Sequence, residues 1–204
     1  MSDVPPEVVE RARRGDAEAF RVIFDSTAAP VRRFCRGLLR DQSAADEAAQ
    51  ETFVRAHARL PTLGDGDRLL PWLLGIARLV SLEQLRRNRR EGPLPALPGE
   101  GDGASGAPGD GWSGSAQAGA GLRDGGPSPE AALLGAEADR QLADALGCLS
   151  EERRAALLLR IDHGLGYPEI ASALGWTLAK VKNEIHRSRL LLRERLGAYL
   201  EGEA

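Results

Sequence analysis

The chain has 204 residues, of which 42% are hydrophobic and 28% charged, and its net charge is −3. This length fits one domain or two small ones, and the scarcity of aromatic residues (4%) predicts cores of Leu, Ala and Val, as in small helical domains. No apolar run of about 18 residues and no signal peptide are present, so we expect a cytoplasmic protein without direct membrane insertion. Cys35 and Cys148 stand far apart with no Cys or His at ligand spacing, which argues against a disulfide framework, a metal site or a cofactor.

The charge is distributed unevenly along the chain. Residues 71–90 carry five arginines against Glu83, and residues 178–196 carry six basic residues against two glutamates, so each segment has a local charge of +4. Residues 91–130 carry six acidic residues against one arginine. Two basic patches joined by an acidic connector are compatible with nucleic-acid binding despite the negative total.

The first elements in chain order are predicted to be helices. Asp16 is suited to cap a helix whose apolar positions include Phe20, Ile23 and Phe24. The helical pattern resumes at Val31, and Pro30 between them predicts a bend or a fresh start.

The rest of the N-terminal half continues this pattern. Ser43 and Asp46 have the spacing of a capping box, with Asp in place of Glu, before a helix that runs to about Leu60. Residues 61–67 contain one proline and two glycines, which predicts a loop, and a last helix follows over residues 71–90. No alternating pattern long enough for a sheet occurs, so the predicted fold class is all-α.

Composition changes abruptly after this helix. Residues 91–129 hold half of the 24 glycines and half of the 12 prolines, which predicts a flexible linker because so little apolar surface can offset the entropy of ordering. Trp112 is its one aromatic residue and is either a solitary exposed side chain or a docking anchor.

Downstream of the linker the sequence is again helical. Ser128 precedes a proline at a predicted first helical position, and Ser150 is suited to cap the next helix, which ends at Gly164. Two short helices are predicted to follow and to form a helix-turn-helix at about residues 166–187.

The helix-turn-helix prediction depends on the coincidence of an inner face, a turn and a polar outer face. Ile170, Ala171 and Leu174 have the spacing of an inner face, Gly175 suits the tight turn, and Thr177 suits the cap of the second helix. Val181 and Ile185 would hold that helix to the core. The outer face then carries residues able to bond base edges in a major groove: Lys180, Lys182, Asn183, Glu184, His186 and Arg187. The alternative is a small helical hairpin with a basic surface.

Several segments resemble a known family in its own order. Residues 15–20 (GDAEAF), 45–56 (ADEAAQETFVRA), 71–78 (PWLLGIAR) and 82–87 (LEQLRR) resemble region 2 of extracytoplasmic-function sigma factors of bacterial RNA polymerase. Residues 149–154 (LSEERR) and 181–189 (VKNEIHRSR) resemble region 4. The resemblance implies two small helical domains, region 2 over residues 1–90 and region 4 over residues 130–204, joined by the linker.

The resemblance also implies partners and functional residues. Core RNA polymerase would bind a set on one helix: Asp46, Glu47, Gln50, Glu51 and Phe53. Minus-ten promoter DNA would contact a second set: Leu63, Asp65, Arg68, Arg78, Arg86, Arg87, Arg89 and Arg90. Minus-thirty-five DNA would contact a third: Lys180, Lys182, Asn183, His186 and Arg187. An anti-sigma factor is expected as a regulatory partner, in a stress or signal response.

Each set has a less specific interpretation. The helix dipole favours acidic residues at the start of a helix, which accounts for Asp46 and Glu47 but poorly for Gln50. The same dipole favours arginines at the end of a helix. Glu184 stands where the family often has a basic residue, and would either accept a hydrogen bond from cytosine or repel phosphates.

The spacing of the two basic patches is expected to be unfixed until a partner orders it.

Two other functions remain as alternatives. A stand-alone helix-turn-helix regulator would explain residues 166–187 but leaves the patterns at residues 45–56 and 71–78 unexplained. An enzyme would need to combine His57, His163 and His186 with a cysteine, although these residues fall on separate helical segments. We therefore expect a promoter-specificity subunit rather than an enzyme.

Overall fold

The computed structural model describes residues 4–64, 68–91 and 144–202. Within these ranges the regular elements are helices, which confirms the all-α class. They are α1 (Pro6–Arg13), α2 (Ala17–Leu39), α3 (Gln42–Arg59), a 3-10 turn η1 (Leu60–Thr62), α4 (Leu69–Glu91), α6 (Glu151–Ile161), α7 (Tyr167–Leu174) and α8 (Leu178–Gly202). The predicted linker with Trp112, and the predicted cap at Ser128, lie outside the described residues. None of the described helices is long and apolar enough to cross a membrane.

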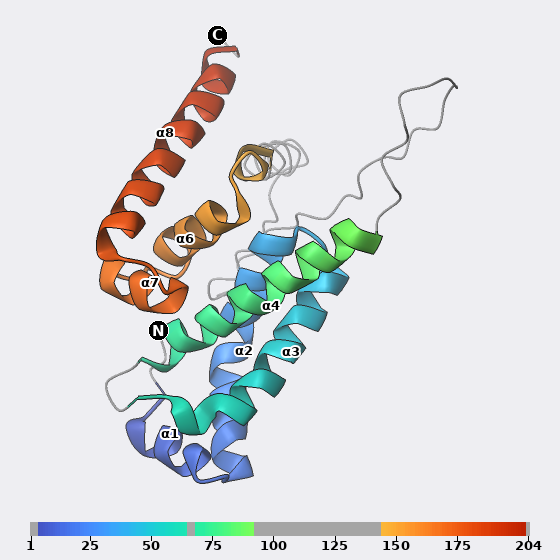
Figure 1. Ribbon diagram of the computed structural model, residues 1–204, viewed down its shortest axis with the longest axis vertical. Coiled ribbons are helices and arrows are strands. Elements are labelled where there is room, and N and C mark those ends of the chain that lie inside the picture. Colours follow the sequence, from blue (N-terminus) through green and yellow to red (C-terminus); the bar gives the residue numbers. More distant parts are fainter. Residues whose placement is uncertain (1–3, 65–67, 92–143, 203–204) are drawn as a thin grey trace, which may run out of the picture.

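The N-terminal half is a bundle in which α2, α3 and α4 pack side by side and the short α1 covers one end (Figure 1). Asp16 caps α2 as predicted, because its Oδ1 accepts from the backbone N–H groups of Glu18 (3.0 Å) and Ala19 (3.1 Å). The helix then continues through Pro30 instead of starting afresh. Buried side chains on both sides of the proline, among them Ile23 and Phe34, hold the two parts of α2 against the same core.

The predicted capping box at the start of α3 is wrong. Asp41 is the N-cap, and its Oδ1 accepts from the N–H of Ala44 at 2.6 Å. The helix therefore begins at Gln42, and Ser43 and Asp46 lie inside it. The displacement has a local cause: α2 ends at Leu39, its C-cap Arg40 is left-handed, and Asp41 is then the one extended residue before α3.

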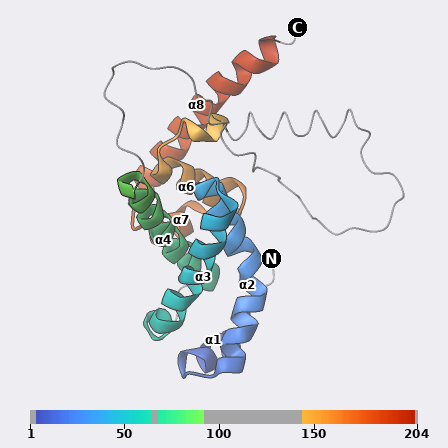
Figure 2. The same ribbon diagram turned by 90° about the vertical axis from the view of Figure 1, so that its right-hand side faces the viewer.

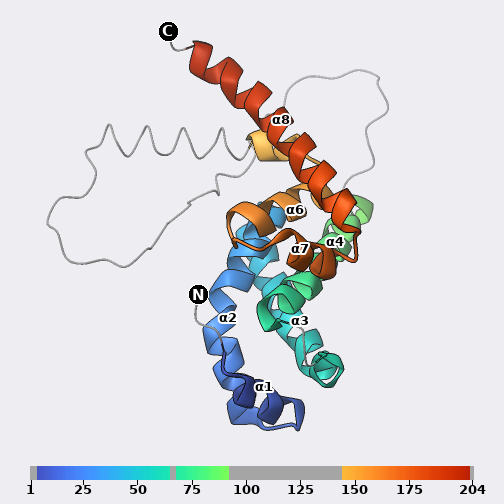
Figure 3. The ribbon, with the colours of Figure 1, turned by 90° about the vertical axis from the view of Figure 1, so that its left-hand side faces the viewer.

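The C-terminal half consists of α6, α7 and α8, preceded by a helical turn at residues 144–147. Ser150 caps α6 as predicted, with its Oγ 3.4 Å from the N–H of Arg153. The last helix is not short: α8 extends to Gly202, and its C-terminal part projects away from the rest of the molecule in both side views (Figures 2 and 3). The basic residues beyond the helix-turn-helix thus continue along one straight helix.

The two halves pack against each other, although we expected their spacing to be unfixed. Helices α6 and α7 lie on α2 and α4 (Figure 3), and one continuous core joins Phe34 and Leu73 of the first half to Ile170 and Leu174 of the second. The helices approach most closely at Gly75 of α4, where a Cβ atom would lie 2.7 Å from the backbone oxygen of Ala173. A glycine is therefore needed at this position for α7 to reach α4.

Arg154 joins the halves through a buried guanidinium group. It donates to the carbonyl oxygens of Leu38 (3.1 Å) at the end of α2 and of Leu146, Gly147 and Leu149 (3.0, 3.4 and 3.3 Å) before α6. Carbonyl groups at a helix end have no partner within the helix, and they attract positive charge. Burial lowers the pKa of Arg154, but a guanidinium remains charged at neutral pH.

We predict that Arg154→Met lowers the free energy of unfolding by about 2–4 kcal/mol, because several buried carbonyl groups lose their donor at once. Urea denaturation at pH 7 measures this change. Arg153→Met is the matched control, since the Arg153 side chain makes a partly exposed ion pair with Glu184 and its removal costs under about 1 kcal/mol. Equal denaturation midpoints for the two variants would contradict the role given to Arg154.

His163 lies in the same contact between halves, in the α6–α7 connection. The residue is 5% exposed, and its ring meets the ring of Phe34 edge-on, with centroids 5.6 Å apart. Burial lowers the pKa of His163 from 6.5 to about 4; the nearby Asp162 opposes this shift and Arg33 adds to it. The neutral imidazole is therefore the form that the folded chain holds.

Because the folded pKa lies below the unfolded one, the contribution of His163 is complete above pH 6.5 and is lost as the pH falls towards 4. Wild type should lose about 3 kcal/mol more stability between pH 7 and pH 4 than His163→Gln, whose side chain does not titrate. Urea denaturation of both proteins across this range measures the difference. Parallel curves would show that His163 is not held neutral by the fold.

Candidate nucleic-acid interface

Helices α7 and α8 form the predicted helix-turn-helix. The turn is made by Gly175, whose φ of 64° lies in the left-handed region, and the N–H of Trp176 then closes on the carbonyl of Ala171 at 2.9 Å. Thr177 caps α8 through its Oγ1, which accepts from the N–H of Lys180 at 3.2 Å. The turn glycine and the cap are thus where the sequence predicted them.

The two faces of α8 are also separated as predicted. Val181 and Ile185 are buried against the core. The five residues expected to contact minus-thirty-five DNA are all exposed: Lys180, Lys182, Asn183, His186 and Arg187. The same helix therefore provides both the anchor and a free polar surface.

Glu184 lies between the two faces and already has partners. Its Oε2 accepts from Nε of Arg153 at 2.6 Å, and its Oε1 lies 3.6 Å from Nη1 of Arg187. Lys180 stands over the ring of Trp176, with Nζ 4.1 Å from the centroid. Trp176 thus helps to position Lys180, and Glu184 helps to position Arg187, before any ligand binds.

The predicted polymerase-binding residues lie on α3. Gln50 is exposed, and Glu47 is exposed with its Oε2 accepting from Nε2 of Gln84 at 2.9 Å. Asp46 pairs with Arg32 and Glu51 with Arg55, both on the surface, at 3.1 and 2.7 Å. Phe53 is placed differently from the others: it is 6% exposed and meets the ring of Phe24 edge-on at 4.7 Å, so that it packs in the core.

The residues predicted to contact minus-ten DNA fall into three groups. The arginines at the end of α4 are exposed: Arg86, Arg87, Arg89 and Arg90. Leu63 is 3% exposed and belongs to the core, and Asp65 lies outside the described residues. Arg68 and Arg78 face the C-terminal half, and Arg78 is only 8% exposed.

Three of these arginines are paired with carboxylates of the C-terminal half. Arg68 pairs with Glu169 of α7, Arg78 with Glu152 of α6 at 3.2 Å, and Arg89 with Glu151 of α6. The sequence did not reveal that glutamates of α6 and α7 pair with these arginines. Glutamates in the first turn of a helix are ordinarily explained by the helix dipole, so the pairing could be found only from the tertiary structure.

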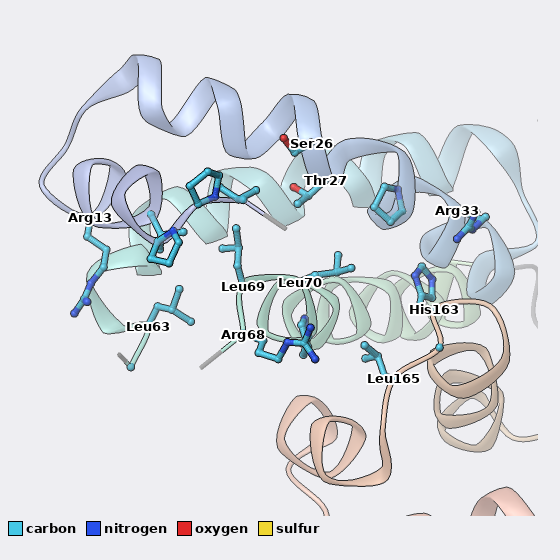
Figure 4. A pocket seen from close by; sticks show the side chains of 18 of the residues that line it. Arg13, Ser26, Thr27, Arg33, Leu63, Arg68, Leu69, Leu70, His163 and Leu165 are labelled. Atoms are coloured by element: carbon cyan, nitrogen blue, oxygen red, sulfur yellow. The ribbon is translucent and has the colours of Figure 1, made fainter. Parts of the chain in front are cut away.

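A cleft of about 1030 Å³ opens between the halves beside these pairs (Figure 4). Leu69 and Leu70 from the start of α4 and Thr27 of α2 line one side, and His163 and Leu165 of the α6–α7 connection line the other. Arg33 of α2 crosses to Asp162, with Nε 2.9 Å from Oδ2. The cleft is therefore a product of the contact between the halves.

The groups that an enzyme would have used lie in separate parts of the fold. His57 packs against the ring of Phe20, His163 against Phe34, and His186 is exposed on α8. Cys35 is buried, and burial raises its pKa to about 11, so that it remains a protonated thiol rather than a nucleophile. This geometry does not favour covalent catalysis at Cys35.

Comparison with family models gives two matches. Residues 23–91 match the model described as Sigma-70 region 2, and residues 139–192 match the model described as Sigma-70, region 4. The first contains the surface of α3 and the arginines of α4, and the second contains the helix-turn-helix.

Individual proteins agree with these models. Over 91% of its length the chain is 30% identical to "Probable RNA polymerase sigma factor RfaY" of Xanthomonas campestris, of which it spans 42%. It is 25% identical to the ECF RNA polymerase sigma factor SigW of Bacillus subtilis over 92% of this chain and 94% of that protein. Among solved structures, the sigma factor RpoE from Bartonella quintana, crystallised with the anti-sigma factor NepR, has a similar fold, with a TM-score of 0.62, 21% identity and coverage of 89% of this chain and 98% of that one.

Proposed function

Because this chain belongs to the sigma-70 family of RNA polymerase sigma factors, in its extracytoplasmic-function group, we propose that it directs core RNA polymerase to a subset of promoters and starts transcription there. The observation that carries the proposal is that one chain presents two distinct surfaces. One is the exposed polar face of α8 in a helix-turn-helix, and the other is the α3–α4 unit with its arginine-rich end. A stand-alone regulator needs the first surface and has no use for the second.

The surface of α3 supports contact with the polymerase. Gln50 is exposed beside the exposed Glu47, and neither Asp46 nor Glu51 is buried by the rest of the chain. The helix dipole favours acidic residues at the start of a helix, so it does not explain an exposed neutral Gln inside α3. Phe53 would act by holding α3 in place through Phe24 and not by touching the polymerase itself.

The proposal is tested by binding to purified core RNA polymerase. We expect the full chain to co-purify with core enzyme, and the double variant Glu47→Ala/Gln50→Ala to lose about tenfold in affinity, because interface polar groups contribute strongly where they are desolvated. Glu7→Ala, an exposed acidic residue of α1, is the matched control and should bind as wild type. If wild type failed to bind core enzyme, the stand-alone regulator would be the better function.

We also propose that an anti-sigma factor regulates the chain. The support is that RpoE from Bartonella quintana, which shares its fold, is crystallised with the anti-sigma factor NepR. The cleft between the halves, with its apolar lining, is a surface that such a partner could occupy.

The two DNA-binding surfaces should differ in what they recognise. Asn183 and Arg187 lie on the exposed face of α8, where they can reach base edges, and alanine at either position should cost about 1–3 kcal/mol and relax preference at one or two base pairs. Arg87 lies at the exposed end of α4, and Arg87→Ala should weaken all promoters about equally and reduce the salt slope by roughly one unit.

Initiation by the holoenzyme on a set of single-base promoter variants, measured at several salt concentrations, separates these two effects. Were Arg187→Ala to weaken every promoter equally while Arg87→Ala changed base preference, the roles given to the two surfaces would be exchanged.

A further inference from the structure

Gln84 of α4 is a polar side chain at a position that faces the interior of the bundle. It is 7% exposed, and it follows the buried residues Ala77 and Ser81 at helical spacing on the same face of α4. Its side-chain amide donates to the carboxylate of Glu47 on α3, with Nε2 and Oε2 2.9 Å apart. A buried amide needs such a partner, because leaving its N–H groups unpaired costs free energy. The contact links the inner face of α4 to an exposed side chain of α3.

This hydrogen bond constrains Glu47 more than it constrains Gln84. Packing already limits the buried Gln84 side chain, whereas the exposed Glu47 side chain would otherwise turn freely in solvent. An ionised carboxylate only accepts hydrogen bonds, so the amide group of Gln84 faces Glu47 with its nitrogen and not with its oxygen. Among the described residues Glu47 has no second hydrogen bond or ion pair, so its Oε1 remains available to a partner.

The next carboxylate along the same face of α3, Glu51, is held in a different way. Arg55 lies between Glu51 and Glu83 of α4: its Nε is 2.7 Å from Oε1 of Glu51, and its Nη1 is 2.7 Å from Oε2 of Glu83. All three side chains are partly or fully exposed, so water screens this pairing and limits its contribution. Gln84 is therefore the buried contact by which α4 fixes a residue that is proposed to bind polymerase.

We propose that Gln84 is a positioning residue for polymerase binding, which holds the Glu47 carboxylate in the orientation that core RNA polymerase contacts. The inference rests on the proposed function, because it takes Glu47 to be a polymerase ligand. Binding has to immobilise a side chain that is free in solution, and this loss of freedom reduces affinity. Less freedom is lost where Gln84 already holds Glu47. The helix whose arginines are proposed to contact DNA thus also prepares the polymerase-binding surface of α3.

Gln84→Met tests the hydrogen bond, because methionine is close to glutamine in size and has no N–H group to donate. We expect Gln84→Met to bind core enzyme about threefold more weakly than wild type, and Glu47→Ala about fivefold more weakly. The double variant Gln84→Met/Glu47→Ala should bind no more weakly than Glu47→Ala alone, because no carboxylate is left for residue 84 to position. The full chain and purified core enzyme are used, and each variant competes against fluorescently labelled wild type.

Leu85→Ala is the matched control for packing. Leu85 is the next residue of α4, is partly buried against the core, and has no polar group that could hold Glu47. Its truncation should lower the urea denaturation midpoint at least as much as Gln84→Met does, because buried apolar contacts are lost. The Leu85→Ala chain should nevertheless bind core enzyme as tightly as wild type. Stability and polymerase affinity are in this way separated.

The comparison of the two backgrounds decides the inference. If Gln84→Met lost the same factor in affinity with and without Glu47, the inference would be overturned, because Gln84 would then act by another route. Wild-type affinity of Gln84→Met, or an equal loss in Leu85→Ala, would overturn it as well. Wild-type affinity of Glu47→Ala would leave Gln84 nothing to position, although the chain would still be a polymerase-binding protein. Failure of the wild-type chain itself to bind core enzyme would instead refute the proposed function.

Discussion

The approach of α7 to α4 at Gly75 is the contact on which the arrangement of the two halves depends. It brings the backbone of Ala173 into the space that any other side chain would need, and it places Ile170 and Leu174 in the same core as Leu73. The contacts made by Arg154 and by His163 follow from the same docking, because both residues lie where α6 and its connection to α7 meet α2. The close approach of the α7 and α4 backbones therefore determines which partners the surrounding charged side chains can contact.

Electrostatics then distinguishes the two basic surfaces. The outer face of α8 stays open, and its acidic residue Glu184 supports the neighbouring Arg153 and Arg187 without covering the helix. At and just before α4, by contrast, carboxylates from α6 and α7 pair with Arg68, Arg78 and Arg89, whereas Arg86, Arg87 and Arg90 have no ion pair with the described residues. The chain has a net charge of −3 and yet carries two basic patches, and some of its acidic residues pair with one of these patches.

Much of the local structure could be predicted, and the failures are instructive. The caps at Asp16, Ser150 and Thr177 and the turn at Gly175 were predicted correctly, since each depends on residues within one or two turns. The start of α3 was placed wrongly because two capping residues compete there, and the left-handed end of α2 at Arg40 favours Asp41. Phe53 and Leu63 were predicted to contact partners but lie in the core, a distinction that the type of residue does not reveal.

By itself the sequence determined the all-α class, the helix-turn-helix, the exposed polar face of α8 and the resemblance to sigma factors, because periodicity, caps and glycine turns act over short stretches of chain. Only the tertiary structure decided that Arg78 is covered while Arg87 is free, and that Glu152 and Glu169 serve as partners of α4. These residues are distant along the chain, and their pairing follows from how two apolar faces dock. The apolar periodicity of the sequence shows that those faces exist, but it does not show which faces pack against each other.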